Sequence, residues 1–171
     1  VLGVLDEVKA VHQASIELGY AVIDVPLRPP IAQVREKIKS VDCGLVFNLF
    51  EGFEGCPETE AIFVEILSNL AIPYTGCPPS ALAIALDKSR TKALLESAGI
   101  GTPRHQLLNS SNLSGFHLSY PCIVKPCGED ASHGMGEESV VRDFASLRNQ
   151  VQKVSELFGG LALVEEFIDG R

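Results

Sequence analysis

Tyr120-Pro121-Cys122-Ile123-Val124-Lys125-Pro126 is the stretch that decides the fold, and it runs into the loop Cys127-Gly128-Glu129-Asp130-Ala131-Ser132-His133-Gly134-Met135-Gly136. The apolar run between the two prolines predicts a buried strand that delivers Lys125 to its end. The loop holds three glycines and a serine, so its backbone can approach a ligand closely and offer N–H groups. An anion, phosphate in particular, suits such a loop. Taken alone, the segment is equally compatible with a polar hairpin that carries a surface lysine.

The composition is that of a globular protein with a small-molecule partner. A chain of 171 residues can bury about 70% of its unfolded surface. Its 14 Lys and Arg against 22 Asp and Glu give a net charge of -8, which argues against a nucleic-acid-binding domain, because phosphate backbones require a basic face. The five cysteines are odd in number and never spaced C-x-x-C, so neither a disulfide framework nor a zinc site is indicated and a cytoplasmic location is expected. Because no apolar run approaches the ~20 residues of a membrane span, no membrane partner is expected.

Apolar runs and helical stripes alternate over the first 78 residues. A helix is expected to open the chain and to end at Gly19, since glycine adopts the left-handed conformation that often ends a helix. Strands are expected at 20–25 and 43–49, helices at 31–38 and 61–70, and a short extended stretch at 72–76. This alternation predicts a small parallel α/β domain over residues 1–78. Because the pattern starts on a helix, we expect a first strand to be missing from it.

Residues 79–171 have a different pattern. A helical linker is expected at 79–100, in which Ser80 caps a helix at 81–86 and Asp87 caps a second helix that ends at Gly99. An α+β lobe is expected at 101–171, with a long helix, capped by Asp143, on one face of a few strands. The expected elements of this lobe are strands at 104–108, 122–125, 140–141 and 161–168 and a helix at 144–158.

Three separated pieces of the second half could meet around one nucleotide. They are Lys88 on its helix, Lys125 with the loop that follows it, and the strand end at residues 165–168. Two lysines can offset the negative charge of bound phosphates. The three pieces are therefore candidates for a single nucleotide site.

The strand end offers a physical match to adenine. In an extended strand the C=O of Glu166 and the N–H of Ile168 face the same side, as the donor and acceptor on adenine require, while Phe167 can cover the ring. Strand alternation sends the side chains of Glu165 and Glu166 to opposite faces, so they are not a catalytic pair. For this segment alone, two exposed acids that end a strand are the better alternative.

Taken together, the pieces resemble the ATP-grasp enzymes, and most closely the D-alanine–D-alanine ligase branch. The resemblance covers about residues 42–171, and it implies a pre-ATP-grasp domain, a short helical segment and the first α+β lobe of an ATP-grasp domain. Its motifs are Ile72-Pro73-Tyr74-Thr75-Gly76, Ser80-Ala81, Asp87-Lys88-Ser89-Arg90-Thr91-Lys92, Gly99-Ile100 with Pro103, residues 121–135, and Leu163-Val164-Glu165-Glu166-Phe167.

The resemblance also implies roles for individual residues. Lys88 and Lys125 bind ATP phosphates, and Ser132 and Gly134 belong to the phosphate loop. The adenine-binding hinge consists of Glu165, Glu166, Phe167 and Ile168.

The implied reaction is ATP-dependent joining of a carboxylate and an amine, both on small molecules such as amino acids or peptide-like acids. ATP phosphorylates the carboxylate, and the amine then displaces phosphate from the acyl phosphate. The family's Mg2+ ligands and catalytic residues lie in a second lobe, which is expected beyond Arg171. No metal ligand is therefore expected within this chain, which alone is expected to be inactive; a homodimer is left open.

Two questions stay open on sequence alone. Asn48, Glu51 and Glu58 either contact the substrate or form a solvated acidic loop. The chain has Asn48-Leu49-Phe50-Glu51-Gly52 where the ligase branch has a His-Gly pair, so D-alanine is not predicted as the substrate. The rival functions are an ATP-binding module without ligase chemistry and a structural fragment without a ligand.

Overall fold

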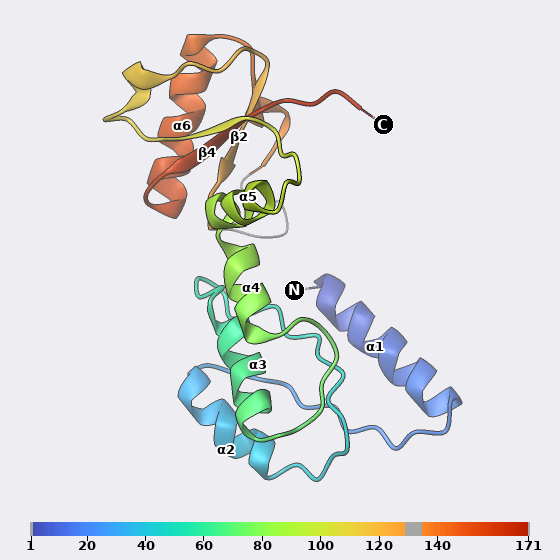
Figure 1. Ribbon diagram of the computed structural model, residues 1–171. Coiled ribbons are helices and arrows are strands. Elements are labelled where there is room, and N and C mark those ends of the chain that lie inside the picture. Colours follow the sequence, from blue (N-terminus) through green and yellow to red (C-terminus); the bar gives the residue numbers. More distant parts are fainter. Residues whose placement is uncertain (1, 129–134, 171) are drawn as a thin grey trace. The chain divides into compact units, whose positions relative to one another are not determined.

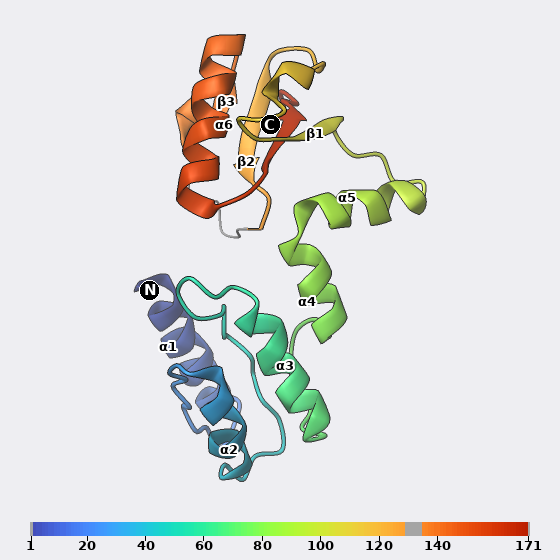
Figure 2. The ribbon, with the colours of Figure 1, turned by 90° about the vertical axis from the view of Figure 1, so that its left-hand side faces the viewer.

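The computed structural model describes residues 2–128 and 135–170. The chain divides into two compact units, residues 1–82 and 83–171, drawn in Figures 1 and 2. Among the residues described, no helix is long and apolar enough to cross a membrane.

Helices build the first unit. They are α1 (Leu2–Glu17), the short 3-10 helix η1 (Ile31–Gln33), α2 (Val34–Lys39) and α3 (Thr59–Asn69). The predicted helices are thereby confirmed, and Gly19 has the left-handed φ of 86° expected after α1. The unit's core lies between α2 and α3 and consists of Val34, Ile38, Phe63, Val64 and Leu67.

The strands predicted for the first unit are wrong. In the described part of this unit, parallel pairing is limited to one bridge between Val46 and Tyr74, with Val46 N–H donating to Pro73 C=O at 2.8 Å. Segment 20–25 belongs to no strand. An apolar run favours an extended segment, but a strand also needs a pairing partner, which a local pattern cannot supply. The predicted parallel sheet is thus reduced to a single bridge.

Two helices follow in sequence, α4 (Pro79–Leu86) and α5 (Lys88–Ser97). The prediction that Ser80 caps α4 is wrong, because the helix already begins at Pro79, a residue suited to the first helical position. The prediction for Asp87 is confirmed: its carboxylate accepts the backbone N–H groups of Ser89 and Arg90, each at 3.0 Å. These bonds fix the first turn of α5.

A four-stranded antiparallel sheet forms the second unit. Its strands are β1 (His105–Leu108), β2 (Cys122–Pro126), β3 (Val140–Val141) and β4 (Ala162–Glu166), in the order β1-β4-β2-β3. The α6 helix (Phe144–Phe158) lies beside the sheet in both ribbon views, and short 3-10 helices η2 (Leu113–Gly115) and η3 (Glu137–Ser139) occupy the connections. The predicted α+β lobe is confirmed.

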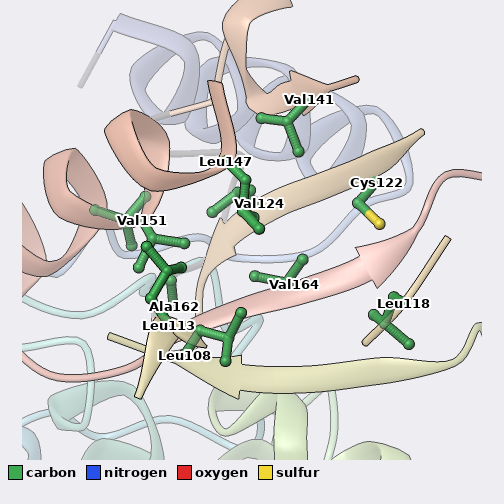
Figure 3. Packing of buried hydrophobic residues seen from close by; sticks show 11 residues of the cluster. Leu108, Leu113, Leu118, Cys122, Val124, Val141, Leu147, Val151, Ala162 and Val164 are labelled. Carbon is green, nitrogen blue, oxygen red and sulfur yellow. The ribbon is translucent and has the colours of Figure 1, made fainter. Parts of the chain in front are cut away.

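One face of this sheet packs against α6 and is called here the apolar face. It consists of Leu108, Cys122, Val124, Ala162 and Val164, all buried. From α6, Leu147, Val151 and Val154 pack against it, and Figure 3 shows Leu147 and Val151 among the labelled side chains. The opposite face of the same strands carries the charged residues described next.

Candidate functional site

The second face of the sheet, called here the polar face, carries Lys125 and Glu165. Glu165 on β4 lies opposite His105 on β1 and Ile123 on β2. Because side chains alternate along a strand, Lys125 projects from the same face as Ile123. Lys92 reaches these residues from α5. Charges from three elements therefore meet on one side of the sheet.

Glu165 is held between two lysines. Its Oε1 lies 2.7 Å from Lys92 Nζ, and its Oε2 accepts a hydrogen bond from Lys125 Nζ at 2.5 Å. Lys92 and Glu165 are each only 6% exposed. Burial acts to raise the pKa of Glu165, but the hydrogen bonds from Lys125 and Lys92 outweigh it, so the pKa lies below its ordinary value. The carboxylate is thus an anion with two cationic partners.

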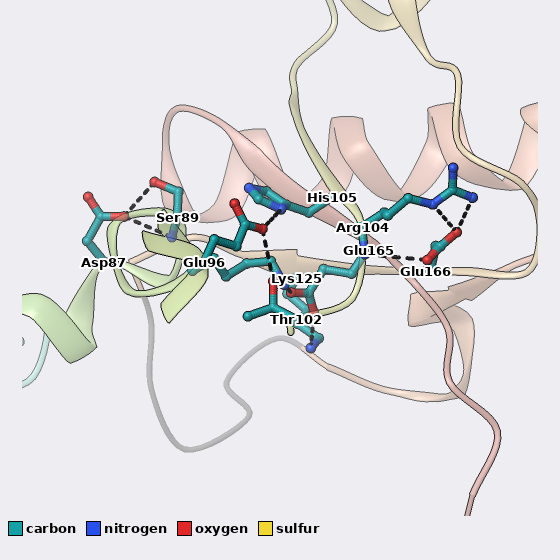
Figure 4. A network of polar contacts seen from close by, with 10 residues as sticks. Asp87, Ser89, Glu96, Thr102, Arg104, His105, Lys125, Glu165 and Glu166 are labelled. Carbon is teal, nitrogen blue, oxygen red and sulfur yellow. Dashed lines mark hydrogen bonds and ion pairs between the residues drawn. The ribbon is translucent and has the colours of Figure 1, made fainter. Parts of the chain in front are cut away.

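Glu166 points to the other side of β4. It forms an ion pair with Arg104, whose Nε donates to Glu166 Oε1 at 2.7 Å, and Figure 4 shows Glu165 and Glu166 diverging toward Lys125 and Arg104. The hydrogen bond from Arg104 lowers the pKa of Glu166. The Arg104 side chain is 67% exposed, so solvent screens this pair. The two glutamates therefore have separate partners, as strand alternation predicted.

The start of α5 lies beside the end of β2. Lys88 N–H donates to the carbonyl of Cys127 at 3.1 Å, and the Cys127 thiol lies 3.7 Å from Asp87 Oδ1. The glycine-containing loop begins at this point. Ser132 and Gly134, which were predicted to bind phosphate, lie outside the described residues.

The strand end at residues 165–168 lies at the opposite end of the β2–β4 pair from this loop. Cys122 pairs with Glu166 at one end, and Pro126 pairs with Ala162 at the other. Four residue steps of a strand span about 13 Å. Phe167 is half-buried, and its N–H donates to Pro121 C=O at 3.1 Å; Ile168 is 66% exposed.

The structure brings together some of the predicted site residues and adds one that the sequence analysis missed. Lys125 contacts Glu165 directly, whereas the backbone N–H of Lys88 donates to Cys127, the residue that follows β2. The sequence analysis named Lys92 only as part of the motif Asp87-Lys88-Ser89-Arg90-Thr91-Lys92 and gave it no role in the site. A signal for it exists, because Lys92 lies four residues after Lys88 and so on the same face of α5.

The first unit contains a separate cavity of about 230 Å3. Asn48 and Glu51 line it together with Glu7 and Glu60, whereas the predicted Glu58 is not among the lining residues. Asn48 Oδ1 accepts the N–H of Phe50 at 3.0 Å, so its amide also shapes the local turn. Substrate contact by Asn48 and Glu51 stays a prediction.

Comparisons with known proteins agree on one group of enzymes. No protein-family model matches the chain. D-alanine–D-alanine ligase B of Pseudomonas putida is 37% identical over 94% of this chain and 52% of the ligase. The crystal structure of a D-alanine–D-alanine ligase from Bacillus anthracis complexed with ATP matches with a TM-score of 0.68 and 26% identity, over 90% of this chain and 48% of that one.

A second solved structure shows the fold alone. The L-amino acid ligase from Bacillus licheniformis matches with a TM-score of 0.63 and 24% identity, over 82% of this chain and 33% of that one. The chain spans about half the length of the curated D-alanine–D-alanine ligases that it matches over most of its own length.

Proposed function

The chain belongs to the D-alanine–D-alanine ligase-like ATP-grasp enzymes, and we propose that its second unit binds ATP for an ATP-dependent ligase that joins a carboxylate to an amine. One observation supports the proposal: the start of α5, which carries Lys88, lies beside the end of β2, which carries Lys125. Lys88 N–H bonds to Cys127 C=O at 3.1 Å, and Lys125 lies two residues earlier on the same strand end.

ATP would extend along the β2–β4 strand pair. Lys88, Lys125 and the loop that contains Ser132 and Gly134 would hold the phosphates. The hinge residues, Glu165, Glu166, Phe167 and Ile168, would hold the adenine at the other end of the pair. The backbones at the two ends lie about 13 Å apart, and the Lys125 side chain reaches along the sheet between them to Glu165.

The two lysines would act by electrostatics. A carboxylate resists attack by an amine until one of its oxygens becomes part of a good leaving group. In the proposed reaction a carboxylate oxygen bonds to the γ-phosphorus as the bond to ADP breaks. The amine nitrogen then attacks the acyl carbon, phosphate leaves and the amine loses a proton. Lysine ammonium groups next to the phosphates offset the charge that develops.

Mg2+ is implied by the family, but this chain offers no site for it among the residues described, which contain no group of three His, Cys, Asp or Glu placed to hold a metal ion. The acid and the amine are proposed to be amino acids or a peptide-like acid with an amino acid, and D-alanine itself is not assigned.

Lysine substitution tests the nucleotide site. In the intact protein, Lys88→Ala and Lys125→Ala should each weaken Mg-ATP binding about tenfold or more, because each removes a charged hydrogen-bond donor. Lys153→Ala is the matched control, since Lys153 pairs with Glu138 at 2.7 Å on the exposed surface of α6. Isothermal titration calorimetry gives the dissociation constants. Unchanged affinity in both site variants refutes the assignment.

Phosphate release separates a ligase from an ATP-binding module. The intact protein, given Mg-ATP and a panel of amino acid pairs and peptide-like acids, should release phosphate only with particular combinations. Binding of Mg-ATP without acid-dependent and amine-dependent phosphate release would favour the module.

A further inference from the structure

Lys92 is a buried cation that the proposed phosphate contacts do not use. Its side chain is 7% exposed, whereas the Lys125 side chain on the same face is 26% exposed. Its ammonium lies 2.7 Å from Glu165 Oε1, and Glu165 is itself 6% exposed. A charge at this depth is tolerated only with a partner of opposite sign. Lys92 and Glu165 therefore depend on each other.

Lys125 can pair with either of two anions, the Glu165 carboxylate and the phosphates of bound ATP. In this structure its ammonium donates to Glu165 Oε2 at 2.5 Å, and in the proposed complex it would face the phosphates of ATP. Turning toward phosphate removes one of the two cations from a buried carboxylate. With Lys92 in place, Glu165 keeps a partner; without Lys92, Glu165 would be left alone and would take up a proton from solvent.

We propose that Lys92 is a positioning residue of the nucleotide site, which keeps Glu165 ionised and in place while Lys125 moves from that carboxylate to phosphate. This inference rests on the proposed function, because it takes Lys125 as a phosphate ligand. Lys92 itself touches no phosphate in this scheme. Its effect on ATP binding passes through Glu165.

Other titratable groups on this face must be separated from Glu165. Lys92 comes from α5, Lys125 from β2, and His105 on β1 lies opposite Glu165 in the sheet register. Glu96 on α5 lies 3.9 Å from His105. Because His105 and Glu96 are the same in every protein compared, differences in proton count between the variants report on Glu165.

The test counts protons taken up when Mg-ATP binds to the intact protein. Titration calorimetry from about pH 7 to about pH 8.5, in buffers of different ionisation enthalpy, compares Lys92→Met with the wild type and with the control Lys153→Met. We expect Lys92→Met to take up about one proton more than either of these proteins. Its affinity for Mg-ATP, relative to theirs, should therefore fall by up to about tenfold for each unit by which the pH rises. A purely structural lysine would lower the melting temperature and leave the proton count unchanged, and that result overturns the inference.

Two further variants keep the test decisive. Lys92→Arg, which keeps the charge, should restore the wild-type proton count, and the double variant Lys92→Met with Glu165→Gln should show no extra proton, because the group that accepts it is gone. If Lys92→Met fails to fold, the test is made on wild-type protein saturated with Mg-ATP, by NMR of the Glu165 carboxyl carbon. Its chemical shift should show that the carboxyl group stays ionised throughout this pH range. A protonated Glu165 overturns the inference. Failure of the wild type to bind Mg-ATP overturns the proposed function as well, whereas normal binding with unchanged proton counts removes only the role of Lys92.

Discussion

The two faces of the sheet in the second unit share β4 but bury it in different ways. Val164 is fully buried against α6 on the apolar face, and the next residue, Glu165, is 6% exposed between two lysines on the polar face. When an apolar side chain is shortened, the loss of stability depends on how many atoms are removed and on the size of the cavity left behind. A buried ion pair does not, because removing one partner leaves an uncompensated charge. Similar burial therefore implies different sensitivity to substitution.

A second contrast lies between neighbouring acids. Glu165 pairs with a lysine whose side chain is 7% exposed, while Glu166 pairs with Arg104, whose side chain is 67% exposed. Solvent screens the second pair but not the first. Only the first pair is expected to control stability.

The largest expected effect comes from Glu165→Gln. This change keeps the shape of the side chain but leaves Lys92 buried without a counter-ion, so we expect a loss of about 3–5 kcal/mol in the free energy of unfolding. Glu166→Gln, the matched control on the same strand, should change it little. Urea denaturation measures both. Equal losses in the two variants would show that the ion pair of Glu165 with Lys92 contributes no more to stability than the ion pair of Glu166 with Arg104.

The apolar face should respond next most strongly. Leu147 is fully buried, and Leu147→Ala should cost about 2–5 kcal/mol by loss of burial and by the cavity it leaves. Leu157, on the same helix, is 64% exposed, so Leu157→Ala serves as the control and should have a small effect. If the two substitutions cost the same, α6 does not pack on the sheet as described.

Acid should weaken the polar face and spare the apolar one. The pKa of Glu165 is lowered in the folded protein, since the two lysines outweigh the opposing effect of burial. Its contribution to stability is therefore present above the unfolded-state pKa, about 4.3 for Glu, and is lost as the pH falls through the folded-state pKa. Asp87 has a lowered pKa as well, from the N–H groups it caps, so the total acid effect is not that of Glu165 alone.

The comparison with Glu165→Gln isolates this contribution. In the variant, the free energy of unfolding should fall less steeply with decreasing pH below about 4.3. Thermal melts of both proteins at a series of pH values measure the difference. Parallel curves would mean that Glu165 is protonated or solvated in the folded state.

The sequence predicted the second unit well because its signals are local. The α6 helix has the predicted bounds, and Asp143 caps it by accepting Ser146 N–H at 2.7 Å. Capping residues, helical stripes and short apolar runs each depend on a few neighbouring residues. The alternation of side chains along β4 was enough to separate Glu165 from Glu166.

Non-local features were beyond the sequence. Segment 20–25 has the composition of a strand, but pairing depends on a partner far along the chain, and the structure assigns it no strand. The burial of Lys92 was missed for a similar reason: its partner Glu165 is distant in sequence, and a helical lysine is ordinarily exposed. Spacing placed Lys92 beside Lys88, but only the fold shows what it contacts.

The smallest expected effect separates the two helix caps. Asp87 caps α5, which carries Lys88 and Lys92, whereas Asp143 caps α6 on the apolar side. Asp87→Ala should lower the free energy of unfolding by about 1 kcal/mol and also weaken Mg-ATP binding, because a frayed first turn displaces Lys88. Asp143→Ala should destabilise the protein without changing Mg-ATP affinity. Calorimetric titration measures the Mg-ATP affinity of both variants. If only Asp143→Ala bound Mg-ATP more weakly, the ligand would lie on the apolar face of the sheet and not on the polar face as proposed.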